Sequence, residues 1–207
     1  MRSKRFNGMV VQPGQHPSSF LSCEKDMEAI VQKLFVDDPT YSTLLKALLC
    51  VNTNDILLPN GGINRNPAYL EKINKMSPKK LHDEQYIRTS PKLTFGENEE
   101  VKSYLLFTFD NFTPCPTNNH YKDCMVMIDI ICHTDYWDLG DYRIRPLKIA
   151  GIIETLLNNT RLSGIGTFEF AGCNEITLSE ELAGYCVMFT ATHGNDDLIP
   201  EVDEDEE

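Results

Sequence analysis

Apolar side chains recur along this chain at two spacings, one typical of helices and one typical of strands. Near the N-terminus they fall three or four residues apart, at Met27, Ile30, Val31, Leu34 and Phe35. This spacing predicts a helix with one buried face, which Ser22 can cap. Asp38 followed by Pro39 predicts a second helix start, because aspartate accepts backbone donors there and proline fits the first helical position. Its apolar side is formed by Leu44, Leu45, Leu48 and Leu49.

The C-terminal half contains four strand-like runs and one helical segment. The runs are 102–110, 124–133, 164–171 and 183–193, and the helix is 145–158. In the run 124–133 both alternating faces are largely apolar, which predicts a central strand covered on both sides. The order of helix, strand, strand, helix, strand, strand predicts an α+β fold. Such a fold would have a small, mostly antiparallel sheet of about four strands with helices packed on it.

The same patterns divide the chain into one domain with additions. We expect an N-terminal arm, a helical element of the core, an extended insertion, an α+β core and an acidic tail, at 1–21, 22–50, 51–100, 101–194 and 195–207. Within the insertion only 67–75 has a helical pattern, and 85–95 could form an extended hairpin or arm. A connection of this length is uncommon in a compact domain. It is therefore interpreted either as a binding arm or lid, or as a poorly ordered insertion.

Charge changes this picture mainly at the two ends of the chain. The formal net charge is −12, which argues against a general nucleic-acid-binding surface. Eight acids lie at Asp196, Asp197, Glu201 and in the run 203–207, without an intervening base. Arg2, Lys4 and Arg5 give the opposite end a positive charge. We expect this arm to contact Asp203, Glu204 and Asp205 of a neighbouring subunit in a ring or stack, unless both ends are independently solvated.

No apolar run approaches the ~20 residues of a membrane-spanning helix. The start MRSKRFNGMVVQPGQ also lacks the apolar centre of a signal peptide. We therefore expect the protein to stay in the compartment where it is made. The seven scattered cysteines are expected to be reduced and partly buried thiols rather than a disulfide framework.

A metal site is the strongest enzymatic candidate, because several thiols and imidazoles lie close together in the sequence. They are Cys115, His120, Cys124, Cys132 and His133, and His193 ends another strand. However, there is no CxxC motif, and Cys132 and His133 are strand neighbours that point to opposite faces. The spacing therefore favours ordinary half-buried side chains, and no metal or other cofactor is expected.

Other catalytic patterns are equally incomplete. A cysteine nucleophile could pair with an imidazole as Cys186 with His193 or as Cys132 with His133, but nothing selects either pair. The carboxylates Asp129, Asp135, Asp138 and Asp141 suggest calcium ligation without the full loop signature, so a polar surface loop is favoured. No phosphate-binding glycine motif is present. We therefore expect that the protein is not an enzyme.

The C-terminal half resembles the neck proteins of tailed bacteriophages, which are tail-terminator-like or head-to-tail connector subunits. The resemblance is carried by DIICHTDYWDLGDYRIRPLKIAGIIETLLN, LSGIGTFEF and LAGYCVMFTATHG, with Arg145-Pro146 introducing the helix. It covers about 111–194, with 23–50 as the first helical element, and implies a tail-terminator-like fold. The long insertion and the acidic tail depart from the simplest members of the group. The resemblance implies a structural virion protein that forms a ring around the DNA channel between portal and tail.

On this interpretation the partners are copies of the chain itself in a ring of six- or twelve-fold symmetry, and other neck, portal or tail proteins. DNA would pass through the channel without specific binding, no membrane would be involved, and the virion would assemble in the host cytoplasm. Subunit contacts are expected at Trp137, Tyr142, Arg143 and Arg145, because large rings bury much area at low entropic cost. Trp137 could instead cover the end of its own core.

Two alternatives remain open. One is a small cytosolic metal-binding or cysteine-dependent enzyme that uses Cys115, His120, Cys124 and His133. The other is a monomeric adaptor that bridges two partners without forming a ring, since assembly and capping of strand edges need the same residues.

Overall fold

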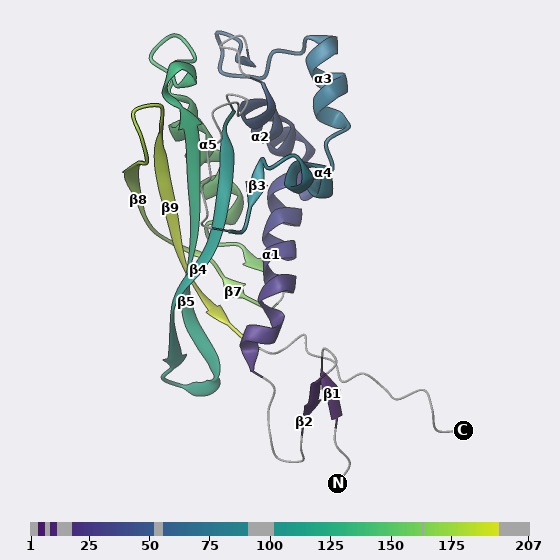
Figure 1. Ribbon diagram of the computed structural model, residues 1–207, viewed down its shortest axis with the longest axis vertical. Coiled ribbons are helices and arrows are strands. Elements are labelled where there is room, and N and C mark those ends of the chain that lie inside the picture. The colour runs from purple at the N-terminus through teal and green to yellow at the C-terminus, as the bar shows by residue number, and fades with distance from the viewer. Residues whose placement is uncertain are drawn as a thin grey trace, which may run out of the picture.

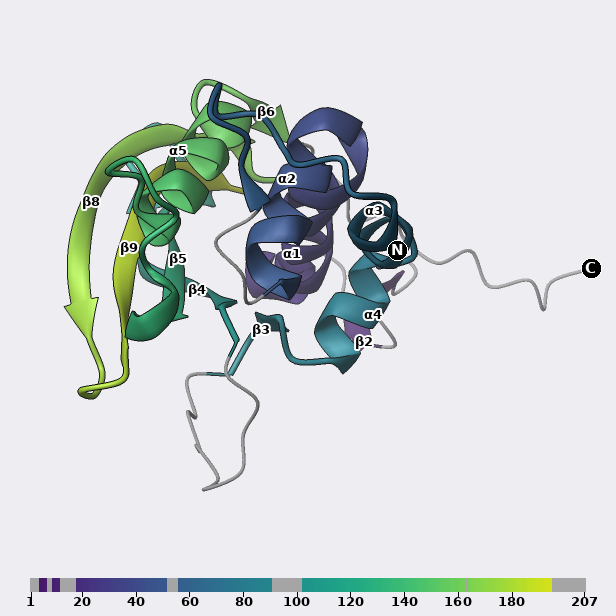
Figure 2. The ribbon, with the colours of Figure 1, turned by 90° about the horizontal axis from the view of Figure 1, so that it is seen from above.

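The main sheet of the described chain is mixed and has five strands, with helices on one side (Figures 1 and 2). The computed structural model describes residues 4–6, 9–11, 18–51, 56–90, 102–162 and 164–194, with backbone alone at 4–6, 9–11 and 118–120. The sheet has the order β3-β4-β5-β9-β8, and every pair except β3 and β4 is antiparallel. Its strands are Ile87–Arg88 (β3), Tyr104–Cys115 (β4), Asn118–His133 (β5), Leu182–His193 (β9) and Glu169–Thr177 (β8). The predicted α+β class is confirmed.

The helices pack around the concave side of this sheet (Figure 2). They are Cys23–Gln32 (α1), Pro39–Cys50 (α2), Pro67–Asn74 (α3), Pro78–Asp83 (α4) and Arg145–Leu157 (α5). Short turns of helix lie at Ser19–Ser22 (η1), Lys33–Asp37 (η2) and Thr134–Tyr136 (η4), and small strand pairs at Lys4–Phe6 (β1) with Met9–Val11 (β2), and Arg161–Leu162 (β6) with Gly166–Thr167 (β7). None of the helices in these described segments is long and apolar enough to cross a membrane.

The two predicted helix starts differ in outcome. The Asp38 carboxylate accepts from the backbone N–H groups of Thr40 and Tyr41, at 3.0 and 3.2 Å, as predicted for a cap followed by proline. Ser22 makes no such bond to α1. Its hydroxyl instead donates to the carbonyl oxygens of Ser19 and Gly194, at 2.8 and 3.2 Å. Ser22 therefore ties the start of α1 to the end of β9.

The core lies between the sheet and the helices. The register places Ile128 opposite Phe107 on one side and Val187 on the other, and all three are buried. Ile149 and Ile153 of α5 join the same cluster. The alternate face is lined by half-buried Met125, Met127 and Met188, among others, and no described helix lies over it (Figure 2). β5 is the middle strand of the sheet order, as predicted, and the described helices cover one of its two faces (Figure 2).

Several boundaries also differ from the predicted ones. The strands 102–110 and 124–133 extend into one long hairpin, with β4 ending at Cys115 and β5 starting at Asn118 (Figure 1). The predicted strand 164–171 is divided into the short β7 and the start of β8 at Glu169, and positive φ angles at Gly164 and Gly166 turn the chain before β8. Within 56–90 the segment interpreted as an insertion adds Ile73, Met76 and other side chains to the core, so this part packs against the domain rather than extending from it.

Candidate functional site

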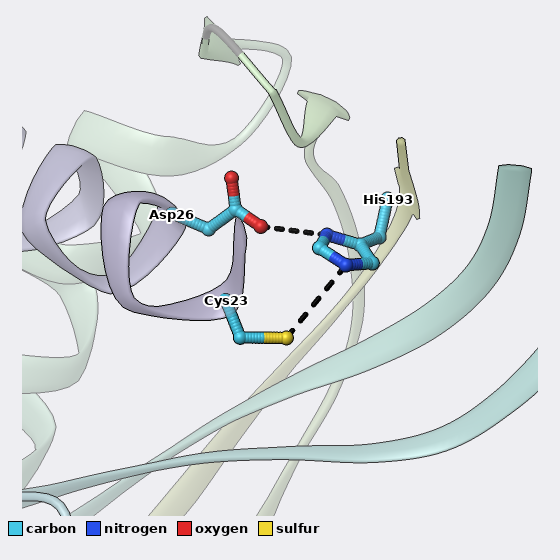
Figure 3. A group of neighbouring side chains, drawn as sticks. All are labelled: Cys23, Asp26 and His193. Atoms are coloured by element: carbon cyan, nitrogen blue, oxygen red, sulfur yellow. Dashed lines mark hydrogen bonds and ion pairs between the residues drawn. The ribbon is translucent and has the colours of Figure 1, made fainter. Parts of the chain in front are cut away.

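Three side chains with reactive or ligating chemistry meet where α1 begins and β9 ends. Cys23 and Asp26 point from α1 toward His193 of β9 (Figure 3). The Asp26 Oδ2 atom lies 2.6 Å from His193 Nδ1, and the Cys23 Sγ atom lies 3.6 Å from His193 Nε2. Among the residues that the structure describes, this is the one group of three or more Cys, His, Asp or Glu side chains close enough to hold a metal ion.

The local sequence explains why these side chains converge. Cys23 and Asp26 are three residues apart on α1, and this spacing places both on one side of a helix. His193 is the last residue of β9 and pairs with Lys122, so the register directs it to the helix-covered face shared with Cys124 and Val126. The hydroxyl of Ser22 holds the two elements together through the Gly194 carbonyl.

The imidazole of His193 is buried and fixed at both nitrogens. Its Nε2 lies 2.6 Å from the Ser19 carbonyl oxygen, to which it donates, and its Nδ1 faces Asp26. The side chains of His193 and Asp26 are 0% and 1% exposed, whereas Cys23 is half-buried. Burial lowers the pKa of His193, but the contacts with Asp26 and Cys23 outweigh this effect and raise that pKa to about 9. The ring is therefore protonated at neutral pH in the metal-free chain.

The ion pair between Asp26 and His193 is close but poorly aligned. Neither Asp26 Oδ2 nor His193 Nδ1 has a hydrogen-bond partner within the described part of the chain, although the two atoms are in contact. Buried polar atoms are nearly always hydrogen-bonded, and exceptions are concentrated at functional sites. The arrangement thus has a buried carboxylate and a buried imidazole nitrogen directed at the same point.

Aromatic rings enclose the site on the side of the long hairpin. Phe112 of β4 packs edge-on against the His193 ring with centroids 5.7 Å apart, and Phe20 packs on Phe112 at 4.7 Å. The Lys122 ammonium lies over the Phe20 ring and donates to the Ser19 hydroxyl. Cys124 lies on the same face, and burial raises the pKa of its thiol to about 12, which keeps it neutral. Cys23 is the half-buried member through which solvent reaches the group.

Arg145, expected at a subunit contact, lies in the interior of its own chain. It is 0% exposed, and its guanidinium donates to the carbonyl oxygens of Tyr136, Leu48 and Val51 at 2.7, 2.7 and 3.0 Å. Leu48 and Val51 lie at the C-terminal end of α2, where unpaired carbonyls attract a cation. The expectation is corrected, because Arg145 caps α2 rather than reaching a neighbouring subunit.

The other predicted contact residues surround a hollow of about 610 Å³ beside η4, which is lined by Trp137, Asp138, Asp141, Tyr142, Arg143 and Ile144. Tyr142 is fully exposed and has a positive φ of 61°. Trp137 is half-buried and donates to the Cys132 carbonyl. Its ring centroid lies 6.3 Å from that of Tyr185. Arg143 donates to the Pro59 carbonyl at 2.6 Å and lies 3.5 Å from Asp141. Of the four residues, Tyr142 is the most accessible to a partner.

Within the described residues, the cysteines and histidines of the candidate metal cluster are not brought together. Cys124 and Cys132 are buried thiols of β5, and Cys115 lies at the hairpin end beside Thr117. His133 contacts Asp135 and Glu181, at 3.7 and 4.0 Å. His193 and Cys186 lie on opposite faces of the sheet, since Cys186 shares the outer face with Asp129. The side chain of His120 lies outside the described residues.

The predicted inter-ring arms are also largely outside the described residues. This applies to Arg2, Asp203, Glu204 and Asp205 and to the side chains of Lys4 and Arg5, whose backbone belongs to β1. Sequence reasoning missed Cys23 and Asp26. The signal that could have identified them is a thiol and a carboxylate three residues apart at a helix start, although their partner is 170 positions away from Cys23.

The fold and this side-chain group define an α+β protein with a polar cluster buried between its first helix and its last long strand. The chain belongs to the YomW family, whose sequence profile matches residues 42–191. A search of curated proteins found no match. Cys23, Asp26 and His193 all lie outside the matched span, so family membership does not account for them.

Proposed function

We propose that this protein is a structural subunit of a tailed-bacteriophage neck, where copies of the chain form a ring between portal and tail around the DNA channel. The proposal rests on the resemblance of the C-terminal half to connector and tail-terminator subunits. The observation that supports it best is that the two opposite flanks of the domain have opposite charge. Such flanks favour head-to-tail contacts, which form a ring where the rotation between successive subunits closes.

One flank is the edge strand β8 with its turn into β9. Residues 169–182 contain four acids and no base, and Glu169 and Glu175 are exposed on β8. The sheet order ends at β8, so no described strand pairs with its outer edge, although the Phe170 N–H donates to Asn158 Oδ1 at 3.1 Å. An open edge can pair with or abut another chain.

The other flank is formed by α3 and α4, on the far side of the molecule from β8 (Figures 1 and 2). Residues 65–84 contain five lysine or arginine residues and three acids, so this flank is positive. Lys72 and Lys79 are exposed there. Complementary potentials of this kind guide association and suppress the wrong orientation.

The convex face of the sheet offers apolar area for the same assembly. Met125, Met127 and Met188 are half-buried on this face, without a described helix over them. The long hairpin of β4 and β5 projects beyond the rest of the sheet (Figure 1). In a ring, a second copy of the chain would cover part of this face, and the hairpin would lie against its neighbour. The net charge of −12 is consistent with a channel that does not retain DNA.

The test is a charge-reversal experiment on the two flanks. We expect Glu169→Lys with Glu175→Lys to weaken assembly, and Lys72→Glu with Lys79→Glu to weaken it similarly. All four changes together should restore it, because the attraction is regained with reversed sign. Light scattering over a concentration series and electron microscopy of the particles measure the outcome. Glu24→Lys with Glu28→Lys on α1 is the matched control.

Two results would count against the proposal. A wild-type protein that stays monomeric at all concentrations, alone and with portal or tail proteins, would exclude a ring. Assembly that is equally sensitive to the control pair and to the flank pairs would show that overall charge, rather than contact between the flanks, controls association.

A further inference from the structure

We propose that Cys23, Asp26 and His193 form a binding site for one divalent transition-metal ion of the zinc class. The ligands would be the Cys23 sulfur, an Asp26 carboxylate oxygen and the Nδ1 atom of His193. One ligand atom of each residue, with either ring nitrogen counted for His193, already lies within 4.8 Å of the others. A water molecule would complete a four-coordinate site.

The donor set matches this class of ion. Thiolate, imidazole and carboxylate are the three side-chain ligands of zinc, and sulfur disfavours the hard cations calcium and magnesium. Because Asp26 and His193 are almost fully buried, a bound ion would be protected from the solvent on that side. Cys23 is half-buried, which leaves a route for entry.

The second nitrogen of His193 has the environment of a metal-ligating histidine. Such a histidine usually donates its other ring N–H to a backbone carbonyl or a carboxylate, which fixes the tautomer. Here Nε2 donates to the Ser19 carbonyl at 2.6 Å, so Nδ1 is the nitrogen available to a metal. Nδ1 and Asp26 Oδ2 are both buried, and neither has a hydrogen bond of good geometry within the described residues.

A buried carboxylate oxygen 2.6 Å from a ring nitrogen requires a positive charge at this point. In the structure the protonated imidazole ring supplies this charge, although its Nδ1–H is poorly aligned with Oδ2. A divalent ion would replace the Nδ1 proton, would separate the two atoms to normal ligand spacing, and would recruit the Cys23 thiolate after rotation about its Cα–Cβ bond. The ion would then join the first turn of α1 to the last residue of β9.

The experiment uses the full-length protein after treatment with a chelator, titrated with Co²⁺ and in parallel with Zn²⁺. Cobalt reports ligand type, because a cobalt–thiolate bond gives a near-ultraviolet charge-transfer band. We expect one Co²⁺ per chain, displaced by Zn²⁺, with that band present. Cys23→Ser should abolish the band, and Asp26→Asn should lower the Co²⁺ affinity at least ~10-fold.

Cys124→Ser is the matched control, because Cys124 lies on the same face of the sheet as His193, on the neighbouring strand β5, and is not a ligand in this proposal. It should keep both the stoichiometry and the band. A protein that binds no stoichiometric Co²⁺ would overturn the proposal. A charge-transfer band that persists in Cys23→Ser would overturn it as well, since another thiol would then be the ligand. Cys23 is half-buried, so its serine variant is expected to fold even if a His193 variant does not.

Discussion

Two buried cationic side chains stand at opposite ends of the sheet, and the protein holds them in different ways. Arg145 lies near the end of β5 where His133 pairs with Leu182, and His193 pairs with Lys122 at the other end. Both are 0% exposed. Arg145 donates to three neutral carbonyl oxygens, whereas His193 contacts one carbonyl, one carboxylate and one thiol.

The difference separates a structural charge from one that can be exchanged. Burial lowers the pKa of Arg145, but a guanidinium stays protonated in proteins, and its fork of donors is satisfied by fixed backbone atoms. An imidazole can release its proton to another cation, and the atoms facing His193 are metal ligands. The Arg145 contacts fix α2 against α5. The His193 contacts fix α1 against β9, and their side chains are of the types that ligate metal ions.

The largest expected effect is the loss of the Arg145 contacts. Arg145→Met keeps most of the apolar stem but leaves the carbonyls of Tyr136, Leu48 and Val51 without this donor. We expect the free energy of unfolding to fall by about 3–5 kcal/mol, because three buried acceptors lose a charged donor at roughly 1–3 kcal/mol each. Urea unfolding followed by circular dichroism measures this change. Arg143→Met is the matched control on the same loop and should cost less than about 1 kcal/mol, because Arg143 is partly solvated.

An Arg145→Met protein as stable as the control variant would contradict this comparison. It would mean that Arg145 is not the cap of α2 that its contacts indicate. A contact role in a neighbouring subunit would then have to be reconsidered.

An intermediate effect is expected at the other end of the sheet. In the presence of a chelator, Asp26→Asn removes the charge that faces His193 and should lower the free energy of unfolding by about 2 kcal/mol, because a buried donor loses its charged partner. Unfolding in urea at neutral pH measures it. Glu24→Gln, an exposed change of the same kind on the same helix, should stay within about 0.5 kcal/mol of wild type. Equal losses in both variants would show that helix charge, rather than the buried pair, is responsible.

The sequence predicted the fold better than it predicted either of these two sites. The spacing of Met27 and Ile30 in α1 and the alternation of Val126 and Ile128 in β5 are local signals, and the structure has a helix and a strand there. The partners of Arg145 are backbone carbonyls, which every residue carries, so no sequence pattern marks them. Cys23 and His193 are 170 positions apart, and only the register of β9 on β5 brings them together.

The smallest change in metal-free stability, and the sharpest test of the comparison, is expected for Cys23→Ser. The serine is smaller and cannot supply a thiolate, but it leaves the Asp26 and His193 pair and the Ser19 carbonyl in place. Without metal its free energy of unfolding should therefore remain within about 0.5 kcal/mol of wild type. With saturating Zn²⁺ the wild-type melting temperature should rise, as binding to the folded state requires, and that of Cys23→Ser should rise much less. Arg145→Met should keep the zinc-dependent rise in melting temperature. Arg145 lies at the other end of the sheet and holds no proton that a metal ion could replace. If zinc stabilised wild type and Cys23→Ser equally, Cys23 would not be a ligand. The His193 contacts, like those of Arg145, would then serve only to hold helices to the sheet.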